Sequence, residues 1–108
     1  PIDADIVLDV RFLLNPYYVP ELRDHNGTEP EVSDYVFTDP QSAEYVKKVT
    51  DLLAFLLPNY IEEGKTSIVI CIGCTGGKHR SVAITEALGR EIAKLDYPVD
   101  CFHRDIDR

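Results

Sequence analysis

The residues best suited to chemistry lie in a glycine-bearing turn between an apolar stretch and an amphipathic one. The turn, Cys74-Thr75-Gly76-Gly77-Lys78, follows the apolar residues 67–73 and precedes His79-Arg80-Ser81. Such a turn can aim several backbone N–H groups at one point, beside the positive end of a helix dipole. Its two glycines lack the Cβ atoms that would keep an anion away. We therefore predict an anion site, with phosphate as the leading ligand.

The predicted contacts combine backbone amides with hydroxyl groups and positive side chains. They come from Thr75, Gly76, Gly77, Lys78, His79, Arg80 and Ser81. In open α/β sheets, ligands sit at the carboxyl ends of strands, which is where this turn must lie. The alternative interpretation is a glycine turn that only packs a strand on a helix and holds no ligand.

The turn does not match the two common nucleotide-binding loops. A Walker-type loop needs a glycine, four residues, Gly-Lys, and then Ser or Thr. With its end placed at Gly77-Lys78, the first glycine would fall on Ile72, and His79 replaces the hydroxyl residue. The Gly-x-Gly-x-x-Gly pattern of dinucleotide-binding proteins is also absent. The sequence therefore argues against a nucleotide loop in this segment.

A second chemistry also fits the turn. Cys74 precedes Arg80 by five intervening residues, which is the spacing that a thiol phosphatase needs to hold a thiolate below an arginine that clamps the phosphoryl oxygens. Such an enzyme also needs an acid for the leaving group, and Asp9, Asp34 or Asp39 could serve. We keep this as the alternative function; the leading interpretation assigns no catalytic residue.

A second group of candidates follows the first apolar stretch. Asp9-Val10-Arg11 ends an expected strand on the same edge as the glycine turn. Either Asp9 only pairs with Arg11 or Arg80, or Arg11 and Asn15 add to the anion pocket. Tyr17 and its neighbour Tyr18 could be packing residues or ligand platforms.

The cysteines do not predict a metal site or a redox pair. Cys71 and Cys74 have Cys-x-x-Cys spacing, but Cys71 lies inside an apolar stretch, which favours burial in the core. Cys101 and His103 supply only half of the four ligands that structural zinc needs. Three cysteines also do not make a disulfide framework, so we expect a reducing, cytoplasmic location.

The hydrophobic pattern predicts strands that alternate with helices. We expect strands at 5–10, 67–73 and 99–103, a short helix at 32–37, a long helix from 40 to 57 that Pro58 ends, and a helix over 80–95. Residues 21–31 are expected to form a loop. This order predicts an α/β fold, a three-layer domain with a mostly parallel sheet, and 108 residues suffice for one domain.

The charges are distributed unevenly. Eleven Lys and Arg oppose nineteen Asp and Glu, a formal net charge of −8, which argues against a generic polyanion binder. Residues 65–94 are the exception, because they carry five basic and two acidic residues. No apolar run approaches the length of a membrane span, so no membrane partner is expected. The chain contains no Met, which is consistent with a domain excised from a longer protein.

Two longer motifs resemble those of a known family. Residues 9–16 and 73–82, together with 1–5 and 103–105, resemble the C-terminal domain of the RapZ-type RNase adaptors, which are also described as bacterial P-loop nucleotide-binding proteins. The resemblance covers nearly the whole chain. It implies a longer protein with an N-terminal Walker-type domain that binds ATP and GTP, so no cofactor is expected in this domain. It also implies a likeness to part of a phosphofructokinase fold.

The resemblance further implies a regulatory role. The C-terminal domain would sense an amino-sugar phosphate, bind small regulatory RNA, form homo-oligomers and present RNA to an endoribonuclease. By position, Thr75, Gly76 and Arg80 would hold the phosphosugar, with help from Tyr17, where the family can have histidine. The weaker expectation of RNA contacts falls on Arg11, Lys78 and Arg104.

Overall fold

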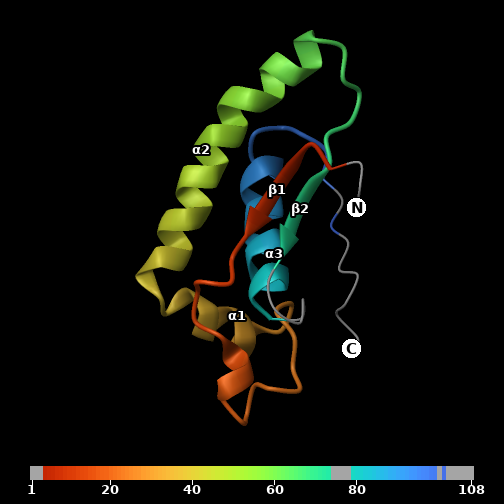
Figure 1. The fold of residues 1–108 in the computed structure, drawn as a ribbon. Coiled ribbons are helices and arrows are strands. Elements are labelled where there is room, and N and C mark those ends of the chain that lie inside the picture. Colours follow the sequence, from red (N-terminus) through yellow and green to blue (C-terminus); the bar gives the residue numbers. More distant parts are fainter. Residues whose placement is uncertain (1–3, 74–78, 100, 102–108) are drawn as a thin grey trace.

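The computed structural model describes residues 4–73, 79–99 and 101. Figure 1 shows the elements in chain order: β1 (Ile6–Asp9), the 3-10 helix η1 (Pro16–Tyr18), α1 (Pro30–Phe37), α2 (Pro40–Glu62), β2 (Ile70–Gly73) and α3 (Arg80–Ala93). The predicted strand, short helix, long helix, strand and helix are therefore present in that order. The turn at 74–78, on which most of the predicted anion contacts fall, lies outside the described residues.

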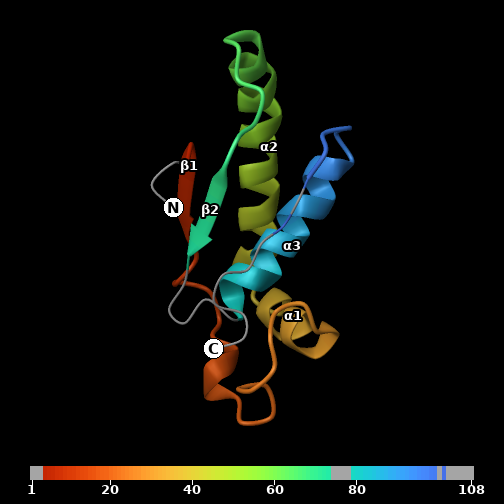
Figure 2. The ribbon, with the colours of Figure 1, turned by 90° about the vertical axis from the view of Figure 1, so that its right-hand side faces the viewer.

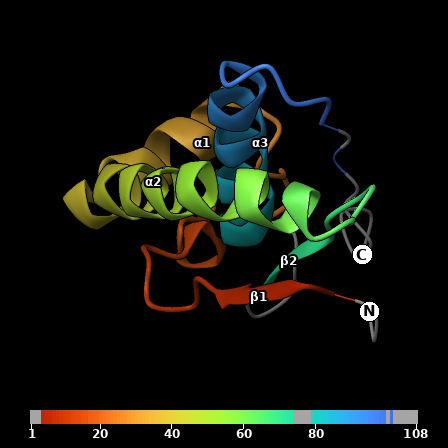
Figure 3. The ribbon, with the colours of Figure 1, turned by 90° about the horizontal axis from the view of Figure 1, so that it is seen from above.

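The two strands pair in parallel, as predicted. Their register places Ile6 beside Ile70 and Asp9 beside Gly73. The three helices lie on one side of this sheet (Figures 2 and 3). On the other face Val7 is 73% exposed, so the described residues form two layers and not the predicted three. The predicted strand at 99–103 falls largely outside the described residues, and neither Val99 nor Cys101 is in a strand.

The hydrophobic core lies between the sheet and the helices. Leu53 of α2 and Ile84 of α3 are fully buried, and the inward side chains of the strands pack against the same cluster. The inward set is Ile6, Leu8, Ile70 and Ile72. Because burial of a large aliphatic side chain contributes about 1.5–3 kcal/mol, this shared core fixes how α3 lies on the sheet. Among the described helices, none is both long and apolar enough to cross a lipid bilayer.

The long helix α2 begins where the sequence predicts and ends later. Asp39 caps it, and its side chain accepts a hydrogen bond from the Gln41 N–H at 2.9 Å. The predicted end at Pro58 is wrong, because α2 continues to Glu62 with Pro58 inside it. Both Pro58 and Ala54, whose carbonyl loses its helical partner, are exposed, so water can hydrate that carbonyl and the proline is tolerated.

The segment between β1 and α1 is held against the first turn of α3. The Nε2 atom of His79 lies 3.0 Å from the carbonyl oxygen of Arg23. Gly27 approaches the same turn so closely that an added Cβ would lie 2.4 Å from the His79 carbonyl oxygen and 2.5 Å from the Ala83 nitrogen. Both of these are backbone atoms, which cannot rotate away. Glycine is therefore required at position 27 by close approach.

An ion pair finishes β1 at the carboxyl edge of the sheet. The Asp9 carboxylate accepts hydrogen bonds from the Arg11 backbone N–H at 2.9 Å and from Arg11 Nε at 2.7 Å. These bonds, with a smaller effect of the Arg80 charge, hold the pKa of Asp9 below its ordinary value. Asp9 therefore stays ionised at neutral pH and fixes the direction in which the chain leaves the strand.

Replacement of Gly27 by Ala is expected to destabilise the fold, because the new methyl group meets backbone atoms that cannot move alone. We expect the free energy of unfolding to fall by about 1–3 kcal/mol, as overpacking usually costs, measured by urea denaturation. Gly73→Ala is the matched control, since among the described residues its added Cβ would meet its nearest atom, the Leu8 carbonyl oxygen, only at 4.0 Å. Equal losses in the two variants would contradict this account of Gly27.

The pKa of Asp9, measured by NMR titration of its carboxyl carbon, is expected to lie below the ordinary value of 3.8. In Arg11→Gln it should rise toward that value, because the charged donor is gone. A carboxyl group with a lowered pKa stabilises the fold above its ordinary pKa, and this contribution is lost as the pH falls through the lowered pKa. An unchanged pKa in Arg11→Gln would show that Arg11 does not hold Asp9.

Candidate anion-binding site

A cleft opens where the carboxyl end of β1 meets the N-termini of α2 and α3. Its volume is about 640 Å³, which is within the range of clefts that bind small molecules. The cleft is lined by Arg11, Phe12, Leu13, Leu14, Asn15, Tyr18, Asp39, Gln41 and Arg80. Two arginines and the N-terminal ends of two helices therefore face one space, an arrangement that favours a negatively charged ligand.

Arg80 is the buried cation of this cleft. It is only 4% exposed, and its Nη1 donates to the carbonyl oxygens of Arg11 and Leu13, the latter at 3.3 Å. Its Nε is buried and has no hydrogen-bond partner among the described residues. No described carboxylate lies within ion-pair distance of Arg80. Because a buried charge and a buried unpaired donor both cost free energy, an anionic group that reached this guanidinium would reduce that cost.

Among the described residues that line the cleft, Arg11 and Arg80 carry positive charges and Asp39 carries a negative charge. The charge of Arg80 acts on the Asp9 carboxylate, which is bound to Arg11, with 2.7 Å between Asp9 Oδ2 and Arg11 Nη2. Arg11 offsets the charge of Asp9, so the charge of Arg80 is not neutralised by that pair. Arg11 itself is exposed at the rim and also lines the cleft.

Two predicted contact residues, His79 and Ser81, are buried at the start of α3. His79 is 6% exposed and its Nε2 contacts the Arg23 carbonyl oxygen; since a carbonyl only accepts, Nε2 carries the proton there. Ser81 is also buried, within the first turn of α3. Neither residue lines the cleft.

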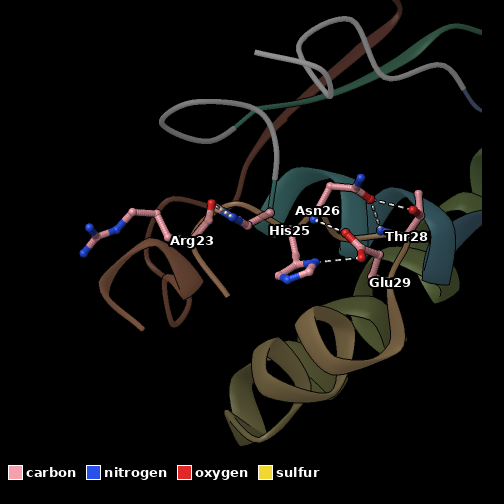
Figure 4. A network of polar contacts seen from close by, with 6 residues as sticks. Arg23, His25, Asn26, Thr28 and Glu29 are labelled. Carbon is pink, nitrogen blue, oxygen red and sulfur yellow. Dashed lines mark hydrogen bonds and ion pairs between the residues drawn. The ribbon is translucent and has the colours of Figure 1, made fainter. Parts of the chain in front are cut away.

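The loop that precedes α1 is fixed by its own polar side chains (Figure 4). The Glu29 carboxylate accepts a hydrogen bond from the Asn26 N–H at 2.8 Å. Its other oxygen lies 2.8 Å from His25 Nδ1, and this hydrogen bond raises the pKa of His25. Oxygen atoms of Glu29 and Glu31 lie within 4.8 Å of His25 and of one another, as metal ligands could. The His25–Glu29 bond and the position of both acids at the start of α1 also explain this group without a metal.

The structure brings together only part of the predicted set. Asn15 and Arg80 line the cleft, as does Arg11, which the sequence offers both as an addition to the anion pocket and as an RNA contact. Tyr17 does not line it, whereas its neighbour Tyr18 does. The predicted contacts Thr75, Gly76, Gly77 and Lys78, the alternative nucleophile Cys74, and Arg104 lie outside the described residues.

Several lining residues were missed by sequence reasoning. Phe12 and Gln41 carried no signal of their own, and Asp39 was considered only as a helix cap or an acid. The predicted start of α2 gave one usable clue, because a helix N-terminus at the carboxyl edge of a sheet adds its first residues to any site there. Of the three candidate acids for a phosphatase, Asp39 alone lines the cleft.

Comparison with known proteins agrees with the two sequence motifs. A family model described as the RapZ C-terminal domain matches residues 1–107. Proteins named nucleotide-binding protein match the whole chain, with 50% identity in Anaeromyxobacter sp. (strain K), 54% in Caldicellulosiruptor saccharolyticus and 53% in Lactobacillus acidophilus. The chain spans only 36–37% of the length of these relatives. The chain therefore belongs to the RapZ C-terminal domain family.

Proposed function

We propose that this chain is a regulatory binding domain whose cleft holds the phosphate group of a small metabolite, with an amino-sugar phosphate as the ligand that the family implies. The observation that carries the proposal is the buried Arg80, whose Nε has no partner among the described residues. Phosphate fits this donor because its tetrahedral oxygens can accept two parallel N–H bonds from one guanidinium.

The position of the cleft supports the same ligand. Arg80 is the first residue of α3, and in the sequence only His79 separates it from the glycine-bearing turn. Backbone N–H groups at a helix N-terminus favour an anion. The exposed Arg11, which is paired with Asp9, would add a second guanidinium group to the ligand contacts at the rim.

The activity of the whole protein is a further proposal. The relatives are named for nucleotide binding, and this chain, which departs from the Walker pattern at Ile72 and His79, spans little more than a third of them. We assign ATP and GTP binding to the remaining two thirds. The family and the names of the relatives do not favour the thiol-phosphatase alternative.

Calorimetric titration with inorganic phosphate and with glucosamine-6-phosphate tests the proposal. In Arg80→Ala the affinity should fall by about 1.5–3 kcal/mol, or roughly 10- to 150-fold, the range for a lost hydrogen bond to a charged group. Arg80→Lys should also bind more weakly, because lysine keeps the charge but loses the fork. Arg90→Gln, an exposed change on the same helix, is the matched control and should bind normally.

The outcomes separate binding from folding. Thermal melts monitored by circular dichroism show whether each variant is folded. If Arg80→Ala does not fold, the binding of Arg80→Lys provides the test. Saturable binding that both Arg80 variants weaken supports the proposal. No binding of either anion to the wild-type chain, or equal binding in folded Arg80 variants, would refute it.

The family implies three further properties, which we propose for the full-length protein: RNA binding, an endoribonuclease partner and the formation of homo-oligomers. The exposed Arg11 at the cleft rim is the described residue that best supports an RNA contact. If the domain binds RNA, gel shifts with structured RNA should weaken steeply as salt rises, and Arg11→Gln should reduce that salt dependence. Absence of any complex at low salt would contradict the RNA role of this domain.

A further inference from the structure

The wall of the cleft carries an exposed aromatic ring that neither the core nor the anion contact uses. Tyr18 lines the cleft with Arg80 and is 76% exposed. A tyrosine side chain this exposed contributes little to the stability of the fold. Its backbone is nevertheless held in place. Pro16, which starts η1, is fully buried, and the Tyr18 N–H donates to the Asn15 carbonyl oxygen at 3.2 Å. The ring is therefore presented to the cleft by a rigid support.

Its neighbour Tyr17 does not line the cleft and is less exposed, at 51%. The guanidinium carbon of Arg23 lies 4.8 Å from the centre of the Tyr17 ring, so one face of that ring is already covered. Arg23 Nε also donates to the Tyr17 carbonyl oxygen at 2.9 Å, which holds this arrangement. The Tyr18 ring meets Tyr17 edge-on, at 5.6 Å between centroids and 86° between planes. Tyr17 thus supports Tyr18 and does not line the cleft.

A second aromatic side chain lies in the same wall. Phe12 is 54% exposed and lines the cleft, and its ring packs against Tyr45 with 5.6 Å between centroids. Gln41 and Asp39, also in the lining, add polar groups from α2. The cleft therefore offers a buried cation, two aromatic rings and a few polar groups, which is the composition of a site for a ring that carries a charged group.

We propose that Tyr18, with Phe12, forms an aromatic subsite that stacks on the ring of a phosphate ester held by Arg80. This inference rests on the proposed function, because the phosphate contact places the ring. The shared chemistry is a flat or C–H-lined ring joined to a phosphate, which can be the pyranose of a sugar phosphate or the base of a nucleoside phosphate. Aromatic side chains can stack on either kind of ring. Stacking does not select one base over another, because every base has a π face.

Titration of the wild-type chain with four phosphate compounds tests the subsite. Inorganic phosphate and glycerol-3-phosphate carry no ring, glucosamine-6-phosphate carries a sugar ring, and adenosine monophosphate carries a base. At least one ring-bearing ester is expected to bind at least fivefold tighter than glycerol-3-phosphate. Tyr18→Ala should lose that gain, an effect of about 5- to 150-fold for a stacked base, and should bind inorganic phosphate as the wild type does.

Two variants control the result. Tyr18→Phe keeps the ring and should keep the gain, while Tyr17→Ala removes a neighbouring tyrosine that does not line the cleft and should change the gain by less than Tyr18→Ala. The ester that loses affinity in Tyr18→Ala identifies the kind of ring. If inorganic phosphate binds through Arg80 but no ring adds affinity, or if Tyr18→Ala keeps the gain, the subsite is refuted and the proposed function stands. If no anion binds, both are refuted.

Discussion

A guanidinium group that is almost completely buried must be satisfied by its neighbours, and at Arg80 those neighbours are backbone carbonyl groups. The bonds from Nη1 to the carbonyls of Arg11 and Leu13 tie the start of α3 to the chain that leaves β1. Because backbone carbonyls are not full negative charges, they satisfy hydrogen bonds without neutralising the cation. The positive charge of Arg80, which lines the cleft, is therefore not neutralised by these bonds, and its buried Nε has no hydrogen-bond partner among the described residues.

Two parts of the scaffold keep this charge in place. β1 ends in the Asp9–Arg11 pair, which fixes the chain direction toward the two carbonyls. The segment between β1 and α1 packs on the first turn of α3 through the close approach of Gly27 and the contact of the Arg23 carbonyl with His79. A chain with a net charge of −8 thus places two arginines, Arg11 and Arg80, in the lining of one cleft.

Sequence reasoning reached the element order and the parallel sheet, because apolar runs and helix caps are local signals. Pro58 misled it, since the tolerance of a proline depends on whether the freed carbonyl faces water. It also located Arg80 and Asn15 in the site from their types and spacing. It could not choose Tyr18 over Tyr17, because that choice depends on Arg23, which reaches back to cover one ring and leaves the other open. The exposed outer face of the sheet could not be predicted either. The hydrophobic pattern indicates which residues are apolar, but it does not show which elements cover each face of the sheet.

The claim that Arg80 holds a donor ready for an anion can be measured at the atom itself. In a ¹⁵N-labelled chain, the Arg80 Nε–H signal, assigned by its loss in Arg80→Lys, is followed by NMR while phosphate is added. The account predicts a saturable downfield shift of that proton, as the unpartnered N–H gains a charged acceptor, with little change at the exposed Arg90 Nε–H. An Arg80 Nε–H signal that stays in place while phosphate reaches saturating concentration would contradict it.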